Sequence, residues 1–582
     1  MWHDRSKRRG AARISGSRMG LALLILLAAP AWAIDIQVDI LGDPVPDGCT
    51  PGHCSLREAI TLANSIPGPD RVLLPATPGV PLQLTIPGGN EDANATGDLD
   101  VLDDLEIIGA GIDTTVLVQT AQDRVLDTQM AATARLVLRG LTIQGGQIGQ
   151  GGGLRSRALT TIEDVAFVGN TAAYEGGAVH YMGGYAPEIA EYRLVLRRVR
   201  FESNAATQVN NDSYGGALHA TSLFDQRPFV LIEDCDFLDN ESKSTGGAIH
   251  LSGSINWYGG GVLIRRSAFS ANRAAGPGGA AIYSTSSGFA LRIEDSRFDD
   301  NVTSGSVATA GGAIALQRTN STVILRTTLS SNSGNRGGAI SSTSALELID
   351  SHLVDNAATR SGGALWSHST VLVDRSTFES NRVTSEDAAD NGGGAIGFSG
   401  TQLTIQRSTF QANRAYRGGA ISLVAGRLQL HGSTIVAPTV VFAGSTGLAL
   451  RILDNDAGNG LVIANTILSG TCTFPGAGRQ LASAFNNIEA PGNSCRLTSA
   501  ALNGFNQVSA TNAQVNLGPL ADNGGPTPTR QPGAGSIAIN QASSFYCTPT
   551  DQRRYARTDG ICDIGAVEVG AIPDELFRDG FD

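Results

Sequence analysis

Short apolar runs rich in Ile, Val, Leu and Phe recur along most of this chain, and Gly, Asn and Ser bound each run. Runs of this length and composition are typical of β-strands, and no sustained helical periodicity crosses the repeated part of the chain. In each repeat a Phe or Leu is followed three places later by Asn, and then by Gly-Gly-Ala and an aliphatic residue. The Asn-to-Asn spacing varies from 24 to 36 residues, so the sequence predicts one structural unit per repeat with loops of different length. The pairs are Phe167/Asn170, Phe201/Asn204, Phe237/Asn240, Phe269/Asn272, Phe298/Asn301, Leu329/Asn332, Leu353/Asn356, Phe378/Asn381 and Phe410/Asn413.

Three short strands and their turns need little more than about 20 residues, because each strand residue advances the chain by about 3.3 Å. Such coils stack along an axis, and each coil buries its inner face against its neighbours. The sequence therefore predicts an all-β fold, a right-handed parallel β-helix (solenoid). A helical cap is expected at its N-terminal end, and a module of strands and loops at its C-terminal end.

Charges of alternating sign stand three places before the Phe of successive repeats, and a second set stands one place earlier. Equivalent residues of stacked coils lie about 4.8 Å apart, where like charges repel, so alternation is what stacking predicts. The other interpretation, paired carboxylates acting as acid and base catalysts, is less favoured, because such ion pairs usually mark a structural face. The first set comprises Asp164, Arg198, Asp234, Arg266, Asp295, Arg326, Asp350, Arg375 and Arg407.

Other positions of the repeat predict inward columns. Two places before Phe the residues are small, and Cys235 in this column is expected to be a buried, unreactive thiol. The Asn residues are expected to form a ladder of amide hydrogen bonds from coil to coil. The Gly-Gly pairs are expected to allow a positive φ and close approach of neighbouring backbones.

The residue after Gly-Gly-Ala-aliphatic is expected to face solvent. Histidine occupies this position in three successive repeats, and a tyrosine follows one repeat later by a shift of one residue. Aromatic residues gather in the same segment, 174–283, which indicates either a groove for sugar rings or a ladder of solvated stacked rings, the preferred interpretation. A histidine row could also hold a metal ion, but Zn²⁺ requires a tighter cluster, so neither a metal site nor a cofactor is predicted. The candidate ligand-binding residues are His180, His219, His250, Tyr283, Trp257 and Tyr258.

Residues 1–33 combine basic residues, an apolar core and the small-residue end Ala31-Trp32-Ala33, which predicts a cleaved secretory signal peptide. Without this segment the formal charge falls from −12 to −17, and Lys243 is the only remaining lysine. Such an acidic chain is not expected to bind nucleic acid or an anionic membrane. No later segment is long and apolar enough to predict a membrane-spanning helix.

The segment Cys49–Gly68 predicts the capping helix. Ser55 and Glu58 form a capping box, and an apolar face follows, with Leu56, Ala59, Ile60 and Ala63. The string "CSLREAI" resembles the motif of the CSLREA-domain family of exported bacterial proteins, and "GDLDV" with "LEIIGAG" in 97–111 is similar to the continuation of that module. The carboxylates of this stretch lack the ligand spacing of a dedicated Ca²⁺ loop, so no Ca²⁺ site is predicted at Asp98, Asp100, Asp103 and Asp104.

The chain has seven cysteines, and those of an exported protein tend to pair. Neighbours in the sequence predict the disulfides Cys49–Cys54, Cys472–Cys495 and Cys547–Cys562. This pairing leaves Cys235 free, inside the repeat region.

Segment 136–421, with its Gly-Gly-Ala-Ile and Phe-x-x-Asn signatures, resembles the repeats of polymorphic outer-membrane proteins, which implies an adhesin-like protein of a Gram-negative bacterium. Segment 422–570 is expected to hold coils in which the repeat decays, and its strings "LGPLADNGGPTPT" and "CDIGAVEV" are similar to the choice-of-anchor Q module of exported β-helix proteins. Residues 571–582 resemble short C-terminal sorting tails. Two further domains are predicted before these segments: the signal peptide in 1–33, and a CSLREA-type capping module together with the first coils in 34–135.

The sequence thus predicts an exported protein of the cell surface, outer membrane or extracellular space. We expect it to bind a polysaccharide or another extracellular or host cell-surface polymer without catalysis. A glycoside hydrolase requires two carboxyl groups that face one substrate, whereas the acids of this chain are spread regularly along the repeats. Two alternatives stay open: a carbohydrate-active enzyme that uses the 174–283 face, and a structural component of the cell envelope.

Overall fold

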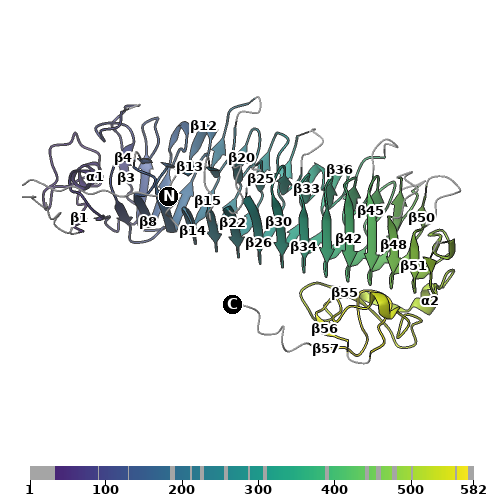
Figure 1. Ribbon diagram of the computed structural model, residues 1–582. Coiled ribbons are helices and arrows are strands. Elements are labelled where there is room, and N and C mark those ends of the chain that lie inside the picture. The colour runs from purple at the N-terminus through teal and green to yellow at the C-terminus, as the bar shows by residue number, and fades with distance from the viewer. Residues whose placement is uncertain are drawn as a thin grey trace, which may run out of the picture.

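The computed structural model describes residues 33–573, apart from 90, 129, 184–190, 210–212, 223–228, 254–259, 286–288, 306–310, 387–391, 439–444, 454–459, 475–480, 500–501 and 558–559. These residues form an elongated solenoid (Figure 1). Three parallel sheets of 30, 14 and 9 strands run along its axis, and its first and last strands are β1 (Asp35–Gln37) and β53 (Leu502–Asn503). None of the described helices is long and apolar enough to cross a membrane.

One coil contains four strands rather than the expected three: β14 (Leu194–Arg197), β15 (Arg200–Glu202), β16 (Ala205–Ala206) and β17 (Leu218–Ser222). The difference arises at Arg198, whose left-handed φ of 52° turns the chain sharply between β14 and β15. Ser203, with φ of 54°, turns it again before β16. Left-handed backbone is uncommon outside glycine, so these corners are a specific feature of the coil.

The 14-stranded sheet carries four of the candidate residues, His180, His219, His250 and Tyr283. Its strands are β4 (Leu99–Val101), β7 (Leu126–Thr128), β10 (Leu154–Ser156), β13 (Val179–Gly183), β17, β21 (Ile249–Gly253), β25 (Ile282–Ser284), β29 (Ile314–Leu316), β33 (Ile340–Ser342), β37 (Leu365–Ser367), β41 (Ile396–Phe398), β44 (Ile421–Leu423), β47 (Leu450–Ile452) and β50 (Cys472–Thr473). The 9-stranded sheet precedes it in nine of the coils, with β9 (Gln147–Gln150), β12 (Thr171–Glu175), β16, β20 (Glu241–Ser242), β24 (Arg273–Ala274), β28 (Val302–Thr303), β32 (Ser333–Arg336), β36 (Ala357–Ser361) and β40 (Arg382–Val383).

The Phe column forms the interior of the solenoid. Phe237 and Phe269 stack with ring centroids 4.6 Å apart and an angle of 2° between the rings, and Phe269 and Phe298 repeat this geometry. These rings are buried and belong to one hydrophobic core that extends from Ile36 to Leu497. The core is continuous because each coil supplies the same inward positions as its neighbours.

The expected amide ladder is present. Each Asn side chain of the column donates from Nδ2 to Oδ1 of the Asn in the next coil, from Asn170 to Asn413, over distances of 2.9–3.1 Å. The small-residue column lies inward as well. Cys235 is buried, as expected, and burial raises the pKa of its thiol to about 12, which disfavours the reactive thiolate.

Both charged columns bind in pairs across coils, as the ladder interpretation predicts. The corner column forms bidentate pairs in which each Arg binds the Asp of the preceding coil: Asp164–Arg198, Asp234–Arg266, Asp295–Arg326 and Asp350–Arg375. In the neighbouring column Arg197 bridges Glu163 and Glu233 at 3.0 and 3.1 Å. Arginines therefore link these acids from coil to coil along the axis, and the acids named here do not converge on one site.

The Gly-Gly turns need glycine for two reasons. Gly176 has a left-handed φ of 60°, and a Cβ there would lie 2.0 Å from the carbonyl oxygen of Val179. At Gly177 a Cβ would lie 2.1 Å from the carbonyl oxygen of Gly216 in the next coil. The turn is therefore tight within its coil and against its neighbour, as the sequence predicts.

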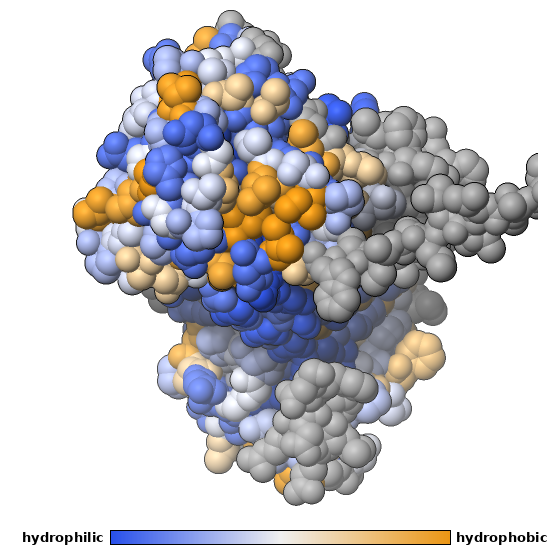
Figure 2. All heavy atoms as spheres, turned by 90° about the vertical axis from the view of Figure 1, so that its left-hand side faces the viewer, coloured by the Kyte–Doolittle hydropathy of each residue, from blue (hydrophilic) through white to orange (hydrophobic). Residues whose placement is uncertain are grey.

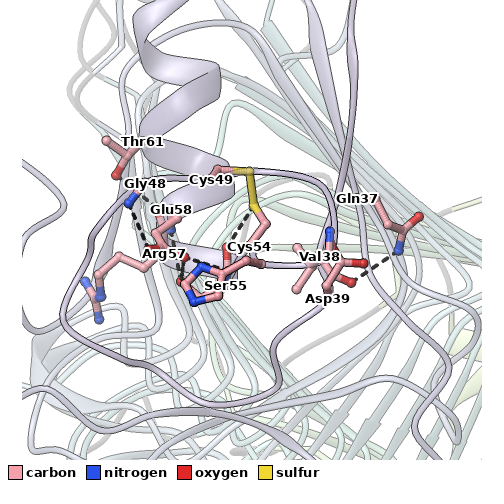
Figure 3. The surroundings of a disulfide bond; sticks show 12 residues. Gln37, Val38, Asp39, Gly48, Cys49, Cys54, Ser55, Arg57, Glu58 and Thr61 are labelled. Carbon is pink, nitrogen blue, oxygen red and sulfur yellow. Dashed lines mark hydrogen bonds between the residues drawn. A yellow bond between two sulfur atoms is a disulfide. The ribbon is translucent and has the colours of Figure 1, made fainter.

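Helix α1 (Leu56–Ser65) has the predicted capping box of Ser55 and Glu58 and buries its apolar face on the first coils. Arg57, between the capping residues, is fully buried and binds Asp43 through two hydrogen bonds of 2.8 and 3.0 Å. It also donates to the carbonyl oxygens of Gly97 and Asp98. Figure 3 shows Arg57 with Ser55 and Glu58 beside the Cys49–Cys54 disulfide. Seen from this end, hydrophilic residues surround an apolar patch near the centre of the view, and further apolar groups lie at its upper and left edges (Figure 2).

The charge of Glu58 makes the cap sensitive to acid. Burial alone would raise its pKa, but bonds from the backbone N–H groups of Ser55, Asp47 and Gly48 and from the Ser55 hydroxyl lower it from 4.5 to about 2. A pKa lowered by folding adds stability above the unfolded value of 4.5, and this stability is lost as the pH falls towards 2. We expect Glu58→Gln to destabilise the cap at pH 7 and the difference from wild type to shrink between pH 4.5 and 2. Hydrogen exchange of α1 across this pH range measures the difference, and a gap that stays constant would contradict the assignment.

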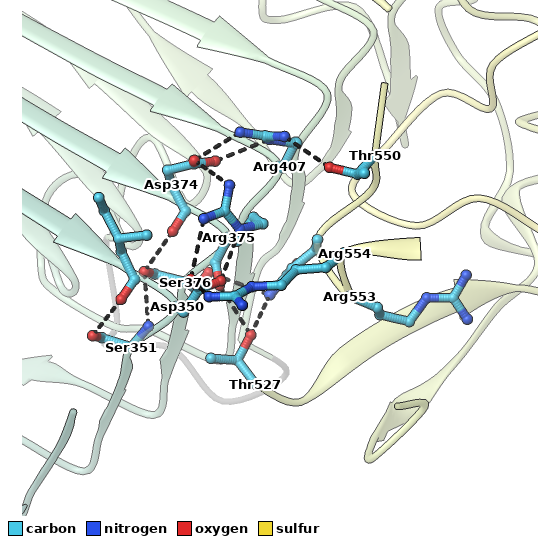
Figure 4. Close-up of polar contacts among 12 residues, drawn as sticks. Asp350, Ser351, Asp374, Arg375, Ser376, Arg407, Thr527, Thr550, Arg553 and Arg554 are labelled. Carbon is cyan, nitrogen blue, oxygen red and sulfur yellow. Dashed lines mark hydrogen bonds and ion pairs between the residues drawn. The ribbon is translucent and has the colours of Figure 1, made fainter. Parts of the chain in front are cut away.

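The C-terminal module folds back along the solenoid (Figure 1). It contains α2 (Asn512–Val515) and two antiparallel pairs, β54 (Leu517–Ala521) with β55 (Thr529–Pro532) and β56 (Tyr555–Ala556) with β57 (Ile572–Pro573). Arg554 binds Asp350 at 2.5 Å, and Arg407 donates to Thr550 at 3.1 Å, so the corner column continues into this contact (Figure 4). Burial raises the pKa of the Asp350 carboxyl, but Arg375 and Arg554 more than offset this effect and lower it.

All three sequence-neighbour disulfides are present: Cys49–Cys54, Cys472–Cys495 and Cys547–Cys562. Cys235 is free and buried. The parallel strands continue beyond residue 421, although the sequence motif is lost there. In the next two coils Ile435 and Leu468 occupy the position of Phe410.

Candidate functional site

A column of polar side chains runs along the first part of the 14-stranded sheet. Its members occupy equivalent positions of adjacent parallel strands, so each lies beside the next. The column joins two features that lie far apart in the sequence, the Asp-rich stretch near residue 100 and the histidine row. In order, its members are Asp100, Asp127, Arg155, His180, His219, His250 and Tyr283.

The histidine row does not face solvent, contrary to the expectation from the sequence. His180, His219, His250 and Tyr283 are only 2, 4, 4 and 7% exposed. Each histidine ring is covered because the Gly-Gly turn brings the residue that stands five places before the histidine across that ring. For the three histidines these covering residues are Glu175, Tyr214 and Thr245, which form a second column of parallel bridges.

The row is a ladder of rings, but a buried one. His180 and His219 stack with centroids 5.2 Å apart and 6° between the rings, and His250 follows at 5.0 Å. Tyr283 meets His250 edge-on at 5.1 Å. The preferred interpretation of stacked rings therefore agrees with the structure, whereas solvation of the ladder does not. Trp257 and Tyr258, the other two candidates, lie outside the described residues.

Burial keeps the three imidazoles neutral. It lowers the pKa of His219 to about 3 and the pKa values of His180 and His250 well below their ordinary value, with a smaller contribution from the charge of a protonated His219. Burial also raises the pKa of Glu175, which the hydrogen bond from Gln150 partly counteracts. The row therefore offers nitrogen lone pairs beside one carboxylate.

A polar cavity of about 280 Å³ lies at the N-terminal end of the column. Arg124 binds Asp98 at 2.7 Å and Asp127 at 3.2 Å, and Arg155 also binds Asp127 through both carboxylate oxygens. Acidic side chains outnumber the two arginines, so the cavity is negatively charged. It is lined by Glu91, Asp92, Asp98, Asp123, Arg124, Asp127, Ile148 and Arg155.

Two of the acids beside this cavity are perturbed. Burial raises the pKa of Asp98 to about 6, although the charge of Arg124 counteracts it. Burial and the charge of Asp98 raise the pKa of Asp100 to about 7, and Asp100 Oδ1 is buried with no hydrogen-bond partner among the described residues. Asp103 and Asp104 instead accept hydrogen bonds from Gly68 and Arg135 backbone N–H groups, so the four Asp residues considered from the sequence do not form one group.

Sequence reasoning missed Asp123, Arg124, Asp127 and Arg155, because alignment began at the first Phe-x-x-Asn repeat, downstream of them. The strands "LDV", "LDT" and "LRS" of β4, β7 and β10 share an apolar, polar, then small or apolar pattern that could have identified the earlier coils. Glu175 was missed because its spacing of five residues from His180 gains meaning only once the Gly-Gly turn is seen to fold back.

Among the described residues, two groups bring three metal-ligating side chains within 4.8 Å of one another: Glu175 with His180 and His219, and Asp92 with Asp100 and Asp127. In the second group, both Asp127 oxygens already accept hydrogen bonds from Arg124 and Arg155. A cation there would face two guanidinium groups, so the first group is better suited to an ion.

Comparison with known proteins supports the architecture. A family model described as the right handed beta helix region matches residues 280–489, from the coil of β25 to that of β52 (Ile488–Ala490). No curated protein matches the sequence. The match does not identify the N-terminal and C-terminal modules, so their resemblances remain predictions. Together with the three long parallel sheets, the match shows that this chain folds as a right-handed parallel β-helix, as its repeats predict.

Proposed function

We propose that this chain is an exported protein that binds an extracellular polysaccharide without cleaving it, and that the polar cavity receives one sugar unit. The cavity carries the proposal: its volume of about 280 Å³ lies at the lower end of ligand pockets, and carboxylates and guanidinium groups line it. β-Helix domains are common in polysaccharide-binding, polysaccharide-degrading and surface proteins. Because a fold does not determine a function, the argument rests on the cavity.

An exposed aromatic ring beside the cavity supports a sugar ligand. Tyr174 is 46% exposed and lies over Gly149, where a Cβ would be 3.9 Å from the ring. Gly149 follows Ile148, which lines the cavity. A sugar bound in the cavity could therefore extend its chain over the Tyr174 ring, whereas the buried histidine row is closed to such a ligand.

The partners of the cavity acids favour binding over catalysis. A glycoside hydrolase needs one carboxyl group as acid and a second as base or nucleophile, both facing the substrate. Here Asp127 binds Arg124 and Arg155, and Asp123 accepts bonds from the backbone N–H groups of Arg124 and Asp98. These acids hold the cavity wall in place.

One observation favours the enzyme alternative. Asp98 lines the cavity and has a pKa of about 6, raised by burial, and a raised pKa is typical of a carboxyl group that donates a proton near neutral pH. A carbohydrate-active enzyme is therefore the second candidate. Its site would be the cavity, not the 174–283 face.

Export rests on the signal peptide predicted in residues 1–33, and the three disulfides fit an oxidising compartment. Attachment to the cell surface through the segment 422–570, and sorting by the tail 571–582, belong to the same proposal. An adhesin-like role follows if the bound polymer lies on another cell.

A glycan array combined with an assay for released sugar tests the proposal on the mature protein. We expect the protein to bind a glycan without releasing sugar. Tyr174→Ala should lower the affinity about tenfold or more, since a stacked aromatic ring contributes on the order of 1.4 kcal/mol. Phe545→Ala should leave the affinity unchanged, because it removes a ring that is 84% exposed in the C-terminal module. Sugar release that disappears in Asp98→Asn would instead establish the enzyme. No binding and no release would leave the structural envelope component.

A further inference from the structure

Two imidazole rings and a carboxylate converge where the turn after β12 meets the 14-stranded sheet. Nε2 of His180 lies 3.4 Å from Oε2 of Glu175, and Nδ1 of His219 lies 3.8 Å from Oε1 of the same carboxylate. Glu175 comes from β12, whereas His180 and His219 are register partners in β13 and β17. Two successive coils thus supply ligands from two sheets.

These distances match a shared metal ion. Zn²⁺ binds His nitrogen at about 2.0–2.1 Å and carboxylate oxygen at about 2.0–2.2 Å in tetrahedral sites, so its ligand atoms lie about 3.4 Å apart. The two His–Glu distances, each to a different oxygen of Glu175, differ from this value by 0.4 Å or less, and the ligand atoms of all three residues lie within 4.8 Å of one another. Because the two rings are nearly parallel and each lone pair lies in its ring plane, the rings have to tilt relative to each other before both nitrogens point at one ion.

The hydrogen bonds around the cluster support this assignment. Nδ1 of His219 is buried and has no hydrogen-bond partner among the described residues, although it points at Glu175. The other ring nitrogen of His219, Nε2, is 2.8 Å from the Ser252 hydroxyl. Gln150 donates to Oε2 of Glu175 at 2.6 Å. Metal-ligating His and carboxylate groups are commonly fixed by such outer partners, which orient the lone pair that ligates.

We propose that Glu175, His180 and His219 bind a divalent transition metal ion of the Zn²⁺ class. Two imidazoles and one carboxylate suit Zn²⁺, Co²⁺ or Ni²⁺ rather than Ca²⁺ or Mg²⁺, which take mainly oxygen ligands. The nearest guanidinium group in the column, on Arg155, is engaged by both oxygens of Asp127. Glu175 retains 24% exposure of its side chain and gives the ion a route from solvent. An ion bound here links two successive coils.

Metal titration of the full chain tests this site independently of any sugar. The protein is expressed without a polyhistidine tag, stripped with a chelator and titrated with Co²⁺, whose visible absorption reports its coordination, and with Zn²⁺ in competition. We expect one bound equivalent, a higher Tm with Zn²⁺ and no such rise with Mg²⁺. Glu175→Gln preserves the size of the side chain and should weaken binding by about 100-fold or more, as should His219→Ala.

His250→Ala is the matched control, because His250 is buried in the same row and stacks on His219 but lies outside the cluster. This variant should bind Co²⁺ within about twofold of wild type, because the outer groups that set metal affinity are those bonded to a ligand, and the His250 ring instead lies 3.2 Å from the Thr245 hydroxyl. Circular dichroism checks that each variant is folded. Absence of Co²⁺ binding, or binding that Glu175→Gln leaves unchanged, would overturn the proposal.

Discussion

Replacement of Arg57 by Ala is expected to destabilise the N-terminal cap by about 3–5 kcal/mol, the usual effect of removing one partner of a buried ion pair. The Arg57 side chain is 0% exposed and that of Asp43 1% exposed. The substitution leaves the Asp43 carboxylate buried without its counter-charge and removes the donors to the carbonyl oxygens of Gly97 and Asp98. Since the cap covers the first coils, we expect increased proteolysis within residues 34–110 before the central coils unfold.

Arg71 provides a matched control for this prediction. It also binds an aspartate, Asp35, through two hydrogen bonds of 2.7 and 2.6 Å, but its side chain is 46% exposed. Arg71→Ala should change the free energy of unfolding by about 1 kcal/mol or less, because solvent screens exposed pairs. Chemical denaturation measures the free energy of unfolding of both variants, and hydrogen exchange of α1 measures the local stability of the cap. Similar losses in Arg57→Ala and Arg71→Ala would show that burial of the Arg57 pair does not stabilise the cap.

The sequence predicted the repeated interior well because stacking demands the same residue type at the same distance from Phe. The Asn ladder, the charge pairs at the Asp164 column and the buried thiol of Cys235 all follow from that one alignment. The capping box of Ser55 and Glu58 was also readable, since it depends on four consecutive residues. Each of these features is local, or repeats at each coil.

The candidate site was less predictable because it depends on how turns fold back over a sheet. Burial of His180 requires Glu175 to cross the ring, and a strand pattern of alternating side chains carries no information on that path. Docking of the C-terminal module joins Arg554 to Asp350, 204 residues apart, outside any repeat. The polar cavity forms where three early coils with different loops meet, so no single motif marks it.

Removal of one rung of the amide ladder is expected to open the centre of the solenoid. The Asn272 side chain makes four hydrogen bonds: Oδ1 accepts from the backbone N–H and the side-chain amide of Asn240, and Nδ2 donates to the Phe237 carbonyl and to Asn301. Asn272→Ala removes the acceptor of two buried Asn240 donors, the backbone N–H and the side-chain amide. An unsatisfied buried group costs about 1–3 kcal/mol, so we expect a loss of about 3 kcal/mol or more.

Because each coil contacts only its neighbours, this loss should be concentrated in the coils of Asn240, Asn272 and Asn301 rather than spread along the chain. Hydrogen exchange resolved by segment measures it: a loss of about 3 kcal/mol corresponds to about 100-fold faster opening of these coils. Asn320→Ala is the control, because that side chain is exposed and its removal should change stability by about 0.5 kcal/mol or less. Equal protection of the central coils in the two variants would mean that core packing, including the Phe stack, holds neighbouring coils together without the amide ladder.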